Sequence, residues 1–144
     1  LRVAGPQTMT HTMSPSSAQT AKSIVLFGHG SRDPLWRQPI DAVAARIRML
    51  DPHAQVSCAF LELTEPDLPT VLDEMVAAGA TRVTIVPMFF GLGRHAREDL
   101  PKLTAELPQR YPGVSFRVLP AVGDDPRVSQ LVATIALDAE AGSL

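Results

Sequence analysis

The stretch "SIVLFGHGSRDP", residues 23–34, decides the fold of this chain. Residues 24–27 are all large and apolar, whereas a strand with one solvated face would alternate apolar and polar residues. The pattern therefore predicts a strand over 23–27 that is covered on both faces. Two glycines then bracket His29, and serine, arginine and aspartate follow, so a polar loop ends the strand. His29 is either a structural residue of a tight turn or part of a reactive site.

Three further apolar runs of strand length follow, each separated from the next by an amphipathic segment. The runs are "QVSCAFLEL" (55–63), "RVTIVPMFF" (82–90) and "VSFRVLPAV" (114–122). Apolar residues at three- and four-residue steps predict helices over 34–50, 67–79, 97–111 and 127–139. Strands alternate with helices, connections are short and tight Asn-Gly hairpins are missing. The pattern indicates an α/β fold, a doubly wound parallel sheet with helices on both faces.

Length and composition favour one domain. The chain has 144 residues, of which 45% are hydrophobic, enough for one sizeable core and too few for two ordinary domains. Residues 1–22 are rich in Thr, Ser, Gln and Pro and have no hydrophobic period, so we expect a mobile tail there. Residues 23–144 are then expected to form the single α/β domain.

Charge and cysteine content limit the partners and the compartment. The net charge is −2 and lysines or arginines form no run, which argues against nucleic acid and anionic membrane surfaces as partners. No stretch reaches the roughly 18 apolar residues of a membrane-spanning helix. Cys58 is the single cysteine and cannot form an internal disulfide, which fits a reducing compartment. The cytoplasm is the expected location.

Three polar residues stand where predicted strands end. His29 follows the first strand, Glu62 lies at the end of the second, and His95 follows the third. In open parallel sheets, ligands bind outside the carboxyl ends of the strands, where the winding direction reverses. With a strand order of 2-1-3-4, these three strands are neighbours. The sequence therefore predicts that His29, Glu62 and His95 converge at one edge of the sheet.

These residue types suit two kinds of chemistry. Two imidazoles and a carboxylate can bind a divalent first-row metal, and they can also transfer protons near neutral pH. Arg32, Arg94 and Arg97 stand beside the histidines, which indicates an anionic ligand, either a polycarboxylate or a phosphate. The structural alternatives stay open, since a histidine in a glycine-rich turn is often a hydrogen-bonding residue and Glu62 could be a surface carboxylate.

Four motifs together resemble a known family. "LFGHGSRDP", "AFLELTEP", "VTIVPMFFGLGRHAREDLP" and "PAVGDDPR" occur in the order found in the small CbiX/SirB group of sirohydrochlorin chelatases, relatives of the class II chelatases that include ferrochelatase. The resemblance covers roughly residues 23–137. It implies a flavodoxin-like, chelatase-like domain that inserts Co²⁺, Fe²⁺ or Ni²⁺ into sirohydrochlorin, for cobalamin or sirohaem, without nucleotide hydrolysis. The metal is then a substrate, and no cofactor is expected.

The resemblance also implies roles for individual residues. His29, Glu62 and His95 match the catalytic residues of the family, with His29 and His95 as the metal ligands. From their residue types, we expect the peripheral carboxylates of the tetrapyrrole to be bound by Gly30, Ser31, Arg32, Arg94 and Arg97. Longer relatives carry two such domains and form a cleft between them. A chain with one domain is therefore expected to form a homodimer.

Two other classes of function compete with this one. The same residues could serve a metal or tetrapyrrole carrier without turnover, or the "GHGSRD" loop, residues 28–33, could bind a phosphate in a flavodoxin-like module. A phosphate site would leave Glu62 dispensable, whereas chelation needs it. A histidine phosphatase is disfavoured, because those enzymes place arginine directly before the reactive histidine and Gly28 occupies that position here.

Overall fold

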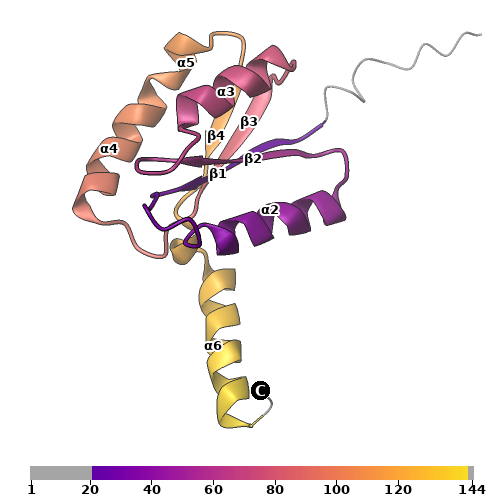
Figure 1. Ribbon diagram of the computed structural model, residues 1–144, viewed down its shortest axis with the longest axis vertical. Helices are drawn as coiled ribbons and strands as arrows, with labels where there is room; N and C mark the ends of the chain where they lie inside the picture. Colours follow the sequence, from indigo (N-terminus) through magenta and orange to yellow (C-terminus); the bar gives the residue numbers. More distant parts are fainter. Residues whose placement is uncertain (1–20, 143–144) are drawn as a thin grey trace, which may run out of the picture.

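The computed structural model describes residues 21–142 and has a four-stranded, all-parallel sheet (Figure 1). The strand order is β2-β1-β3-β4, as the sequence predicts. The elements are β1 (Ser23–Gly28), α2 (Gln38–Leu50), β2 (Gln55–Phe60), α3 (Leu68–Ala77), β3 (Arg82–Pro87), α4 (Arg94–Ala105), α5 (Leu107–Arg110), β4 (Ser115–Val118), the 3-10 turn η1 (Val122–Asp124) and α6 (Pro126–Glu140). Most of the expected tail, residues 1–20, lies outside the described residues. Within residues 21–142, no helix has the length and apolarity to cross a membrane.

Strand β1 lies in the middle of the sheet and explains the consecutive apolar residues. It pairs with β2 on one side and with β3 on the other, so that Phe27 stands between Ala59 and Pro87. Val25, Leu26 and Phe27 are all at most 1% exposed. Both faces of β1 are therefore covered, as the apolar run predicts.

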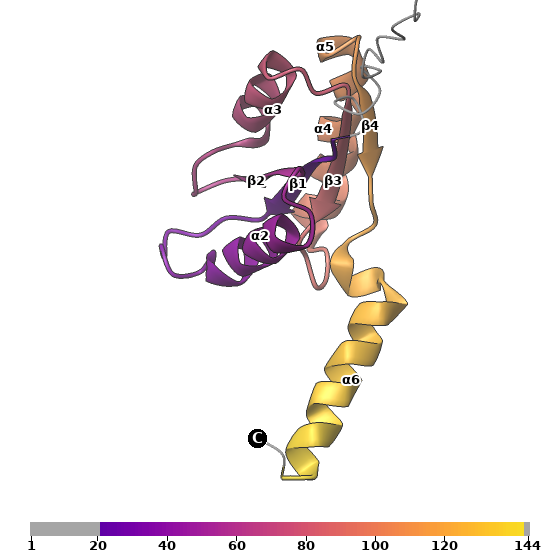
Figure 2. The same cartoon turned by 90° about the vertical axis from the view of Figure 1, so that its right-hand side faces the viewer.

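The two faces of the sheet build separate cores. Val25 and Phe27 point to the face that carries α3 and the α4–α5 pair, where they pack against residues such as Leu72. Leu26 points to the opposite face and packs against Ile40 and the rest of the α2 contact. Figures 1 and 2 show α2 on one side of the sheet and α3 with α4 and α5 on the other. The doubly wound α/β prediction is thus confirmed.

Helix boundaries differ from the sequence prediction at two places. The first helix begins at Gln38 instead of residue 34, because Asp33 accepts hydrogen bonds from the amides of Leu35 and Trp36 and holds a turn there. The segment 97–111 was predicted as one helix. It forms part of α4, which starts at Arg94, and the short α5. Pro108 has no N–H to donate and restricts the preceding residue, which accounts for the break.

The last predicted helix forms but does not pack on the sheet. Helix α6 covers residues 126–140, close to the predicted 127–139, and none of its residues is buried. Figure 2 shows it extending away from the body of the domain as a separate rod. The face of the sheet next to α2 is therefore left partly open.

One capping contact supports a testable stability prediction. Asp67 caps α3 by accepting a hydrogen bond of 3.0 Å from the amide of Thr70. Asp67→Ala should lower the free energy of unfolding by about 1 kcal/mol, as measured by urea denaturation at pH 7, whereas Asp67→Asn should retain most of it. An equal loss in both variants would contradict the capping role.

The same contact predicts a dependence on pH. The hydrogen bonds from Thr70 lower the pKa of the Asp67 carboxyl below its ordinary value. A carboxyl with a lowered folded-state pKa stabilises the protein above its unfolded pKa of about 4. The difference in stability between wild type and Asp67→Ala should therefore shrink as the pH falls below about 4.

Candidate functional site

The loops that follow β1 and β2 run side by side beyond the ends of the strands. The amide of Leu61 donates to the carbonyl of Gly28 at 2.9 Å, and the amide of Glu62 donates to the carbonyl of His29 at 3.0 Å. These bonds continue the parallel pairing of the two strands past their last paired residues, Gly28 and Phe60. The backbone thus places His29 and Glu62 next to each other.

Gly30 makes this close approach possible. Its φ is +103°, a conformation that residues with a side chain rarely adopt. A Cβ atom on Gly30 would lie 1.6 Å from the carbonyl oxygen of Glu62, which belongs to the backbone and cannot swing aside. The loop therefore requires glycine at this position for both conformational and steric reasons.

A second contact ties the two loops together at Ser31 and Thr64. The Ser31 amide donates to Thr64 Oγ1 at 2.9 Å, and Thr64 Oγ1 donates to the Ser31 carbonyl at 2.7 Å. Ser31 Oγ in turn accepts a hydrogen bond from the amide of Asp33. The sequence analysis did not identify Thr64, because its role depends on a loop 33 residues away and leaves no local pattern.

The central contact of the site joins two side chains. His29 Nε2 lies 2.9 Å from Glu62 Oε1, and the side chains of His29 and Glu62 are 45% and 56% exposed. In the tautomer in which Nε2 carries the proton, Nε2 donates to the Glu62 carboxylate and Nδ1 is an acceptor. The ring of Phe89 packs edge-on against the imidazole, with centroids 6.4 Å apart. The imidazole is thus oriented by a carboxylate on one side and an aromatic ring on another.

The spacing of the two groups also fits a metal ion. Nitrogen and oxygen ligands bind divalent first-row ions at about 2.1 Å. Two such bonds at a right angle place their ligand atoms about 3.0 Å apart, close to the 2.9 Å between His29 Nε2 and Glu62 Oε1. A divalent ion that displaces the shared proton could therefore be held by both side chains.

His95 is not joined to this pair. It is the second residue of α4, on the loop side of β3, and its side chain is exposed. Among residues 21–142, the structure brings no three His, Cys, Asp or Glu side chains close enough to hold a metal. The predicted convergence is therefore realised for His29 and Glu62, whereas His95 stands apart from them.

The first turn of α4 carries cations in place of the usual carboxylates. Arg94 pairs with Glu98 at 3.2 Å, and no ion pair to Arg97 or Arg32 forms within the described part of the chain. Gly93 precedes the helix and offers no side chain to cap its free amides. Free amides at a helix start together with arginines favour an anionic ligand.

Exposed apolar side chains follow the same three strands. Leu35, Leu63 and Phe90 are 64%, 55% and 70% exposed, and they follow β1, β2 and β3 respectively. Leu63 has a φ of +63°, which is uncommon for leucine and marks a strained loop position. In "MFF", 88–90, Phe89 is buried and Phe90 is exposed. The three exposed residues Leu35, Leu63 and Phe90 are called the apolar rim, and they offer a surface for a flat hydrophobic ligand.

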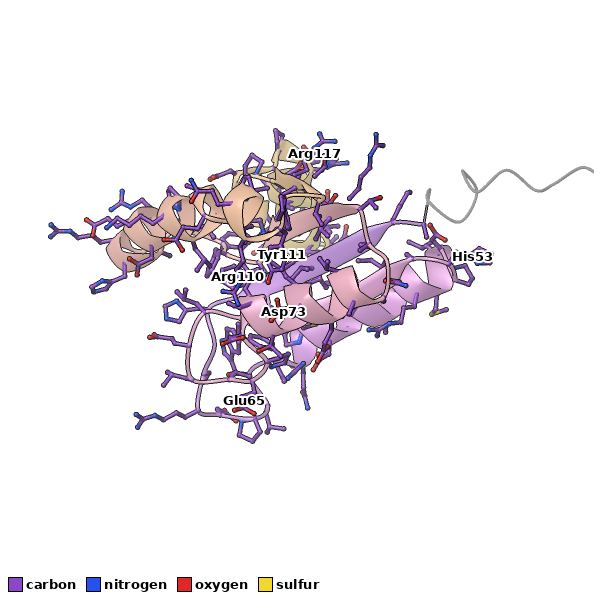
Figure 3. All side chains as sticks on the ribbon, turned by 90° about the horizontal axis from the view of Figure 1, so that it is seen from above. His53, Glu65, Asp73, Arg110, Tyr111 and Arg117 are labelled. Atoms are coloured by element: carbon purple, nitrogen blue, oxygen red, sulfur yellow. The ribbon has the colours of Figure 1, made fainter. Side chains whose placement is uncertain are left out.

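Other chemically capable residues lie away from the site. Figure 3 shows His53 at the opposite end of α2 from the Glu65 loop, and His11 lies outside the described residues. Cys58 is partly buried, and burial raises the pKa of its thiol, so it is a poor metal ligand near neutral pH. Tyr111 donates to Asp73 at 2.5 Å between α5 and α3, and burial raises its pKa to about 12. That contact is structural.

The match to a known family covers nearly all of this domain. Residues 23–139 match the CbiX family. The chain belongs to the CbiX family. The match begins with β1 and includes both loops that hold the His29–Glu62 pair.

Named relatives are chelatases. A sirohydrochlorin cobaltochelatase from Methanococcus aeolicus is 33% identical over 82 residues, which are 57% of this chain and 57% of the relative. A sirohydrochlorin ferrochelatase from Bacillus subtilis is 32% identical over 114 residues, 77% of this chain and 42% of the relative. This CbiX chain spans 57% to 61% of the length of the first archaeal relatives that it matches.

Solved structures of CbiX and SirB proteins share the fold. A CbiX protein of cobalamin biosynthesis from Marinobacter aquaeolei is 27% identical, with a TM-score of 0.72 over 85% of this chain and 97% of that one. The sirohydrochlorin chelatase SirB from Bacillus subtilis subspecies spizizenii, in complex with cobalt, is 29% identical. Its TM-score is 0.67 over 82% of this chain and 50% of that one. The chelatase-like fold expected from the sequence is confirmed.

Proposed function

We propose that this CbiX chain is a lyase that inserts a divalent metal, Co²⁺, Fe²⁺ or Ni²⁺, into sirohydrochlorin. The observation that carries the proposal is the His29–Glu62 pair, 2.9 Å apart at the carboxyl edge of the sheet. Relatives named as sirohydrochlorin chelatases support the substrate. The family match does not distinguish among the metals, since relatives bear both cobalt and iron names.

The chemistry requires a base and a place for the metal. Entry of one divalent ion releases two protons from the central N–H groups of the macrocycle. Before insertion, the neutral imidazole of His29 would hold the incoming metal, with Glu62 as a further ligand. When the metal passes to the macrocycle, the ring nitrogen of His29 that is released accepts one of the two protons, and Glu62 or His95 accepts the other as a base. We propose His95, the second residue of α4, as the second imidazole of this reaction.

The surroundings suit the rest of the substrate. Sirohydrochlorin carries eight carboxylates around a flat macrocycle. We propose that Arg32, Arg94 and Arg97, Ser31 and the backbone at Gly30 bind these carboxylates. The apolar rim would contact the face of the macrocycle. No separate cofactor takes part, because the metal is itself a substrate.

The assembly and the location belong to the same proposal. We propose a homodimer, in which the chelatase-like domains of two copies, residues 23–144, form a cleft like that of the two-domain relatives. The single cysteine and the lack of basic runs favour the cytoplasm, without a nucleic-acid or membrane partner.

The test is an anaerobic insertion assay. Purified protein is mixed with sirohydrochlorin and Co²⁺, Fe²⁺ or Ni²⁺ in turn, and the visible spectrum is followed against the spontaneous rate. The proposal expects acceleration with at least one metal, and the rates then rank the metals. Binding of metal or macrocycle without acceleration would overturn it in favour of a carrier. Affinity for a phosphorylated ligand that survives Glu62→Gln would favour the phosphate-binding module.

A further inference from the structure

The loop between β2 and α3, which Figure 3 marks at Glu65, contains a strained turn. Leu63 has a φ of +63°, in the left-handed region that residues other than glycine rarely adopt. The amide of Thr64 donates to the carbonyl of Glu62 at 2.7 Å and closes a three-residue turn across Leu63. A residue in such a conformation persists only where its surroundings hold it there. The contacts around this turn must therefore include one that holds it.

The strain does not serve the core of the domain. The Glu62 side chain is 56% exposed and Leu63 is 55% exposed, so the turn buries neither residue. The turn instead brings the Glu62 carboxylate to 2.9 Å from His29 Nε2. Backbone strain concentrates at functional positions, where it fixes the direction of a side chain. The placement of Glu62 beside His29 is thus what the strained turn achieves.

The contact between His29 and Glu62 does not hold the turn by itself. Both side chains are about half exposed, at 45% and 56%. Pairs of exposed side chains contribute little to stability, because water competes for both partners and both side chains lose conformational freedom. The contact is therefore a result of the loop conformation, and the constraint must come from the backbone of the two loops.

Thr64 supplies this constraint. Its Oγ1 accepts a hydrogen bond from the Ser31 amide at 2.9 Å and donates one to the Ser31 carbonyl at 2.7 Å. Both residues are half-buried, so water competes less here than at the exposed His29–Glu62 pair. Backbone hydrogen bonds join the two loops before Leu63, at the Glu62 amide, and the Thr64 hydroxyl joins them again after it. The strained residue is thus held from both sides.

We propose that Thr64 is a positioning residue for metal binding, because its hydroxyl holds the strained turn and so keeps the Glu62 carboxylate beside His29. Without the hydroxyl, Leu63 relaxes to a negative φ, and the carboxylate moves away from His29 Nε2. This inference rests on the proposed use of His29 and Glu62 as metal ligands. It adds a residue that acts on the metal only through Glu62.

The first test is the affinity of the full chain for Co²⁺ in the absence of macrocycle, measured by isothermal titration calorimetry. Thr64→Val keeps the shape of the side chain and removes the hydroxyl. Groups behind metal ligands contribute about 10- to 100-fold to metal affinity, so we expect Co²⁺ to bind about 10-fold more weakly. Thr64→Ser keeps the hydroxyl and should retain most of the affinity. A wild type that binds no Co²⁺, unchanged affinity in Thr64→Val, or an equal loss in Thr64→Ser would overturn the proposal.

Thr104→Val is the matched control. Thr104 is half-buried like Thr64, and its Oγ1 donates to the carbonyl of Leu100 at 2.9 Å. It lies at the other end of α4 from His95, so the same chemical change should leave the Co²⁺ affinity unchanged. An equal loss in Thr104→Val would contradict a specific role of Thr64. Urea denaturation checks that each variant is folded, and Thr64→Ala takes the place of Thr64→Val if that chain does not fold.

The insertion assay separates this inference from the proposed function. With sirohydrochlorin and Co²⁺, Thr64→Val should lower kcat by about 10-fold and change KM for the macrocycle much less, because Thr64 acts on the metal site. A wild type that accelerates insertion, with an equal kcat in Thr64→Val, would overturn the role of Thr64 and leave the proposed function in place. A wild type without acceleration would overturn the proposed function, and the Co²⁺ affinities would then decide on Thr64.

Discussion

Replacing His29 by alanine is expected to lower the rate of metal insertion into sirohydrochlorin by about 100-fold or more. The imidazole is the base of the proposed reaction and one of its metal ligands, and alanine can replace neither role. The measurement is the initial rate of the visible spectral change in the anaerobic assay, with metal and macrocycle both in excess over protein.

The fold should tolerate this change. His29 is half-exposed and contacts Glu62 and Phe89 at the rim of the domain, so its loss leaves the core in place. His53→Ala is the matched control, because His53 lies at the far end of α2 and should retain the wild-type rate. A folded His29→Ala protein with a rate within a few-fold of wild type would contradict the proposed role.

Gly30→Ala is expected to damage both stability and activity. The new Cβ would collide with the Glu62 carbonyl, and φ at this position is +103°. Strained backbone costs on the order of 1–3 kcal/mol and overpacking a similar amount, so the free energy of unfolding should fall by about 2–6 kcal/mol. Insertion activity should be lost as well, because relief of the collision separates the loops that carry His29 and Glu62. Urea denaturation and the insertion assay measure the two effects.

Gly79 offers a control with the same backbone conformation. Its φ is +97°, but a Cβ there would meet nothing within 4 Å. Gly79→Ala should therefore show the cost of the positive φ alone, about 1–2 kcal/mol, with full activity. Equal losses in the free energy of unfolding of Gly30→Ala and Gly79→Ala would show that the close approach of Gly30 to Glu62 does not add to the cost.

The sequence was sufficient to predict the sheet and the approach of His29 to Glu62. Consecutive apolar residues at 24–27 predicted a strand covered on both faces, and the alternation of elements predicted a parallel, doubly wound sheet. The flavodoxin-like order 2-1-3-4 expected for such a sheet is the order that the structure has. Once the order is known, the neighbouring strands β1 and β2 must bring His29 and Glu62 to one edge. Topology, rather than any local motif, made that contact predictable.

The parts that sequence reasoning missed depend on distant contacts. Thr64 joins the two loops through its hydrogen bonds to the backbone of Ser31. The residues next to Thr64 in sequence form no pattern that would predict these bonds. The placement of His95 depends on the loop that leads into α4, whose path has no periodicity to predict. The amphipathic pattern of residues 127–139 predicts a helix with an apolar side. It does not specify whether the surface that covers that side belongs to the same chain.

The most direct test of the account asks whether His29 and Glu62 act as one unit during metal insertion. Rates are compared for wild type, His29→Ala, Glu62→Gln and the double variant, each checked for folding by circular dichroism. We expect Glu62→Gln alone to lower the rate of metal insertion strongly. We expect the double variant to be no slower than His29→Ala, because Glu62 has no imidazole left to assist once His29 is replaced. A Glu62→Gln rate close to wild type, or losses that multiply in the double variant, would contradict the shared role of the pair.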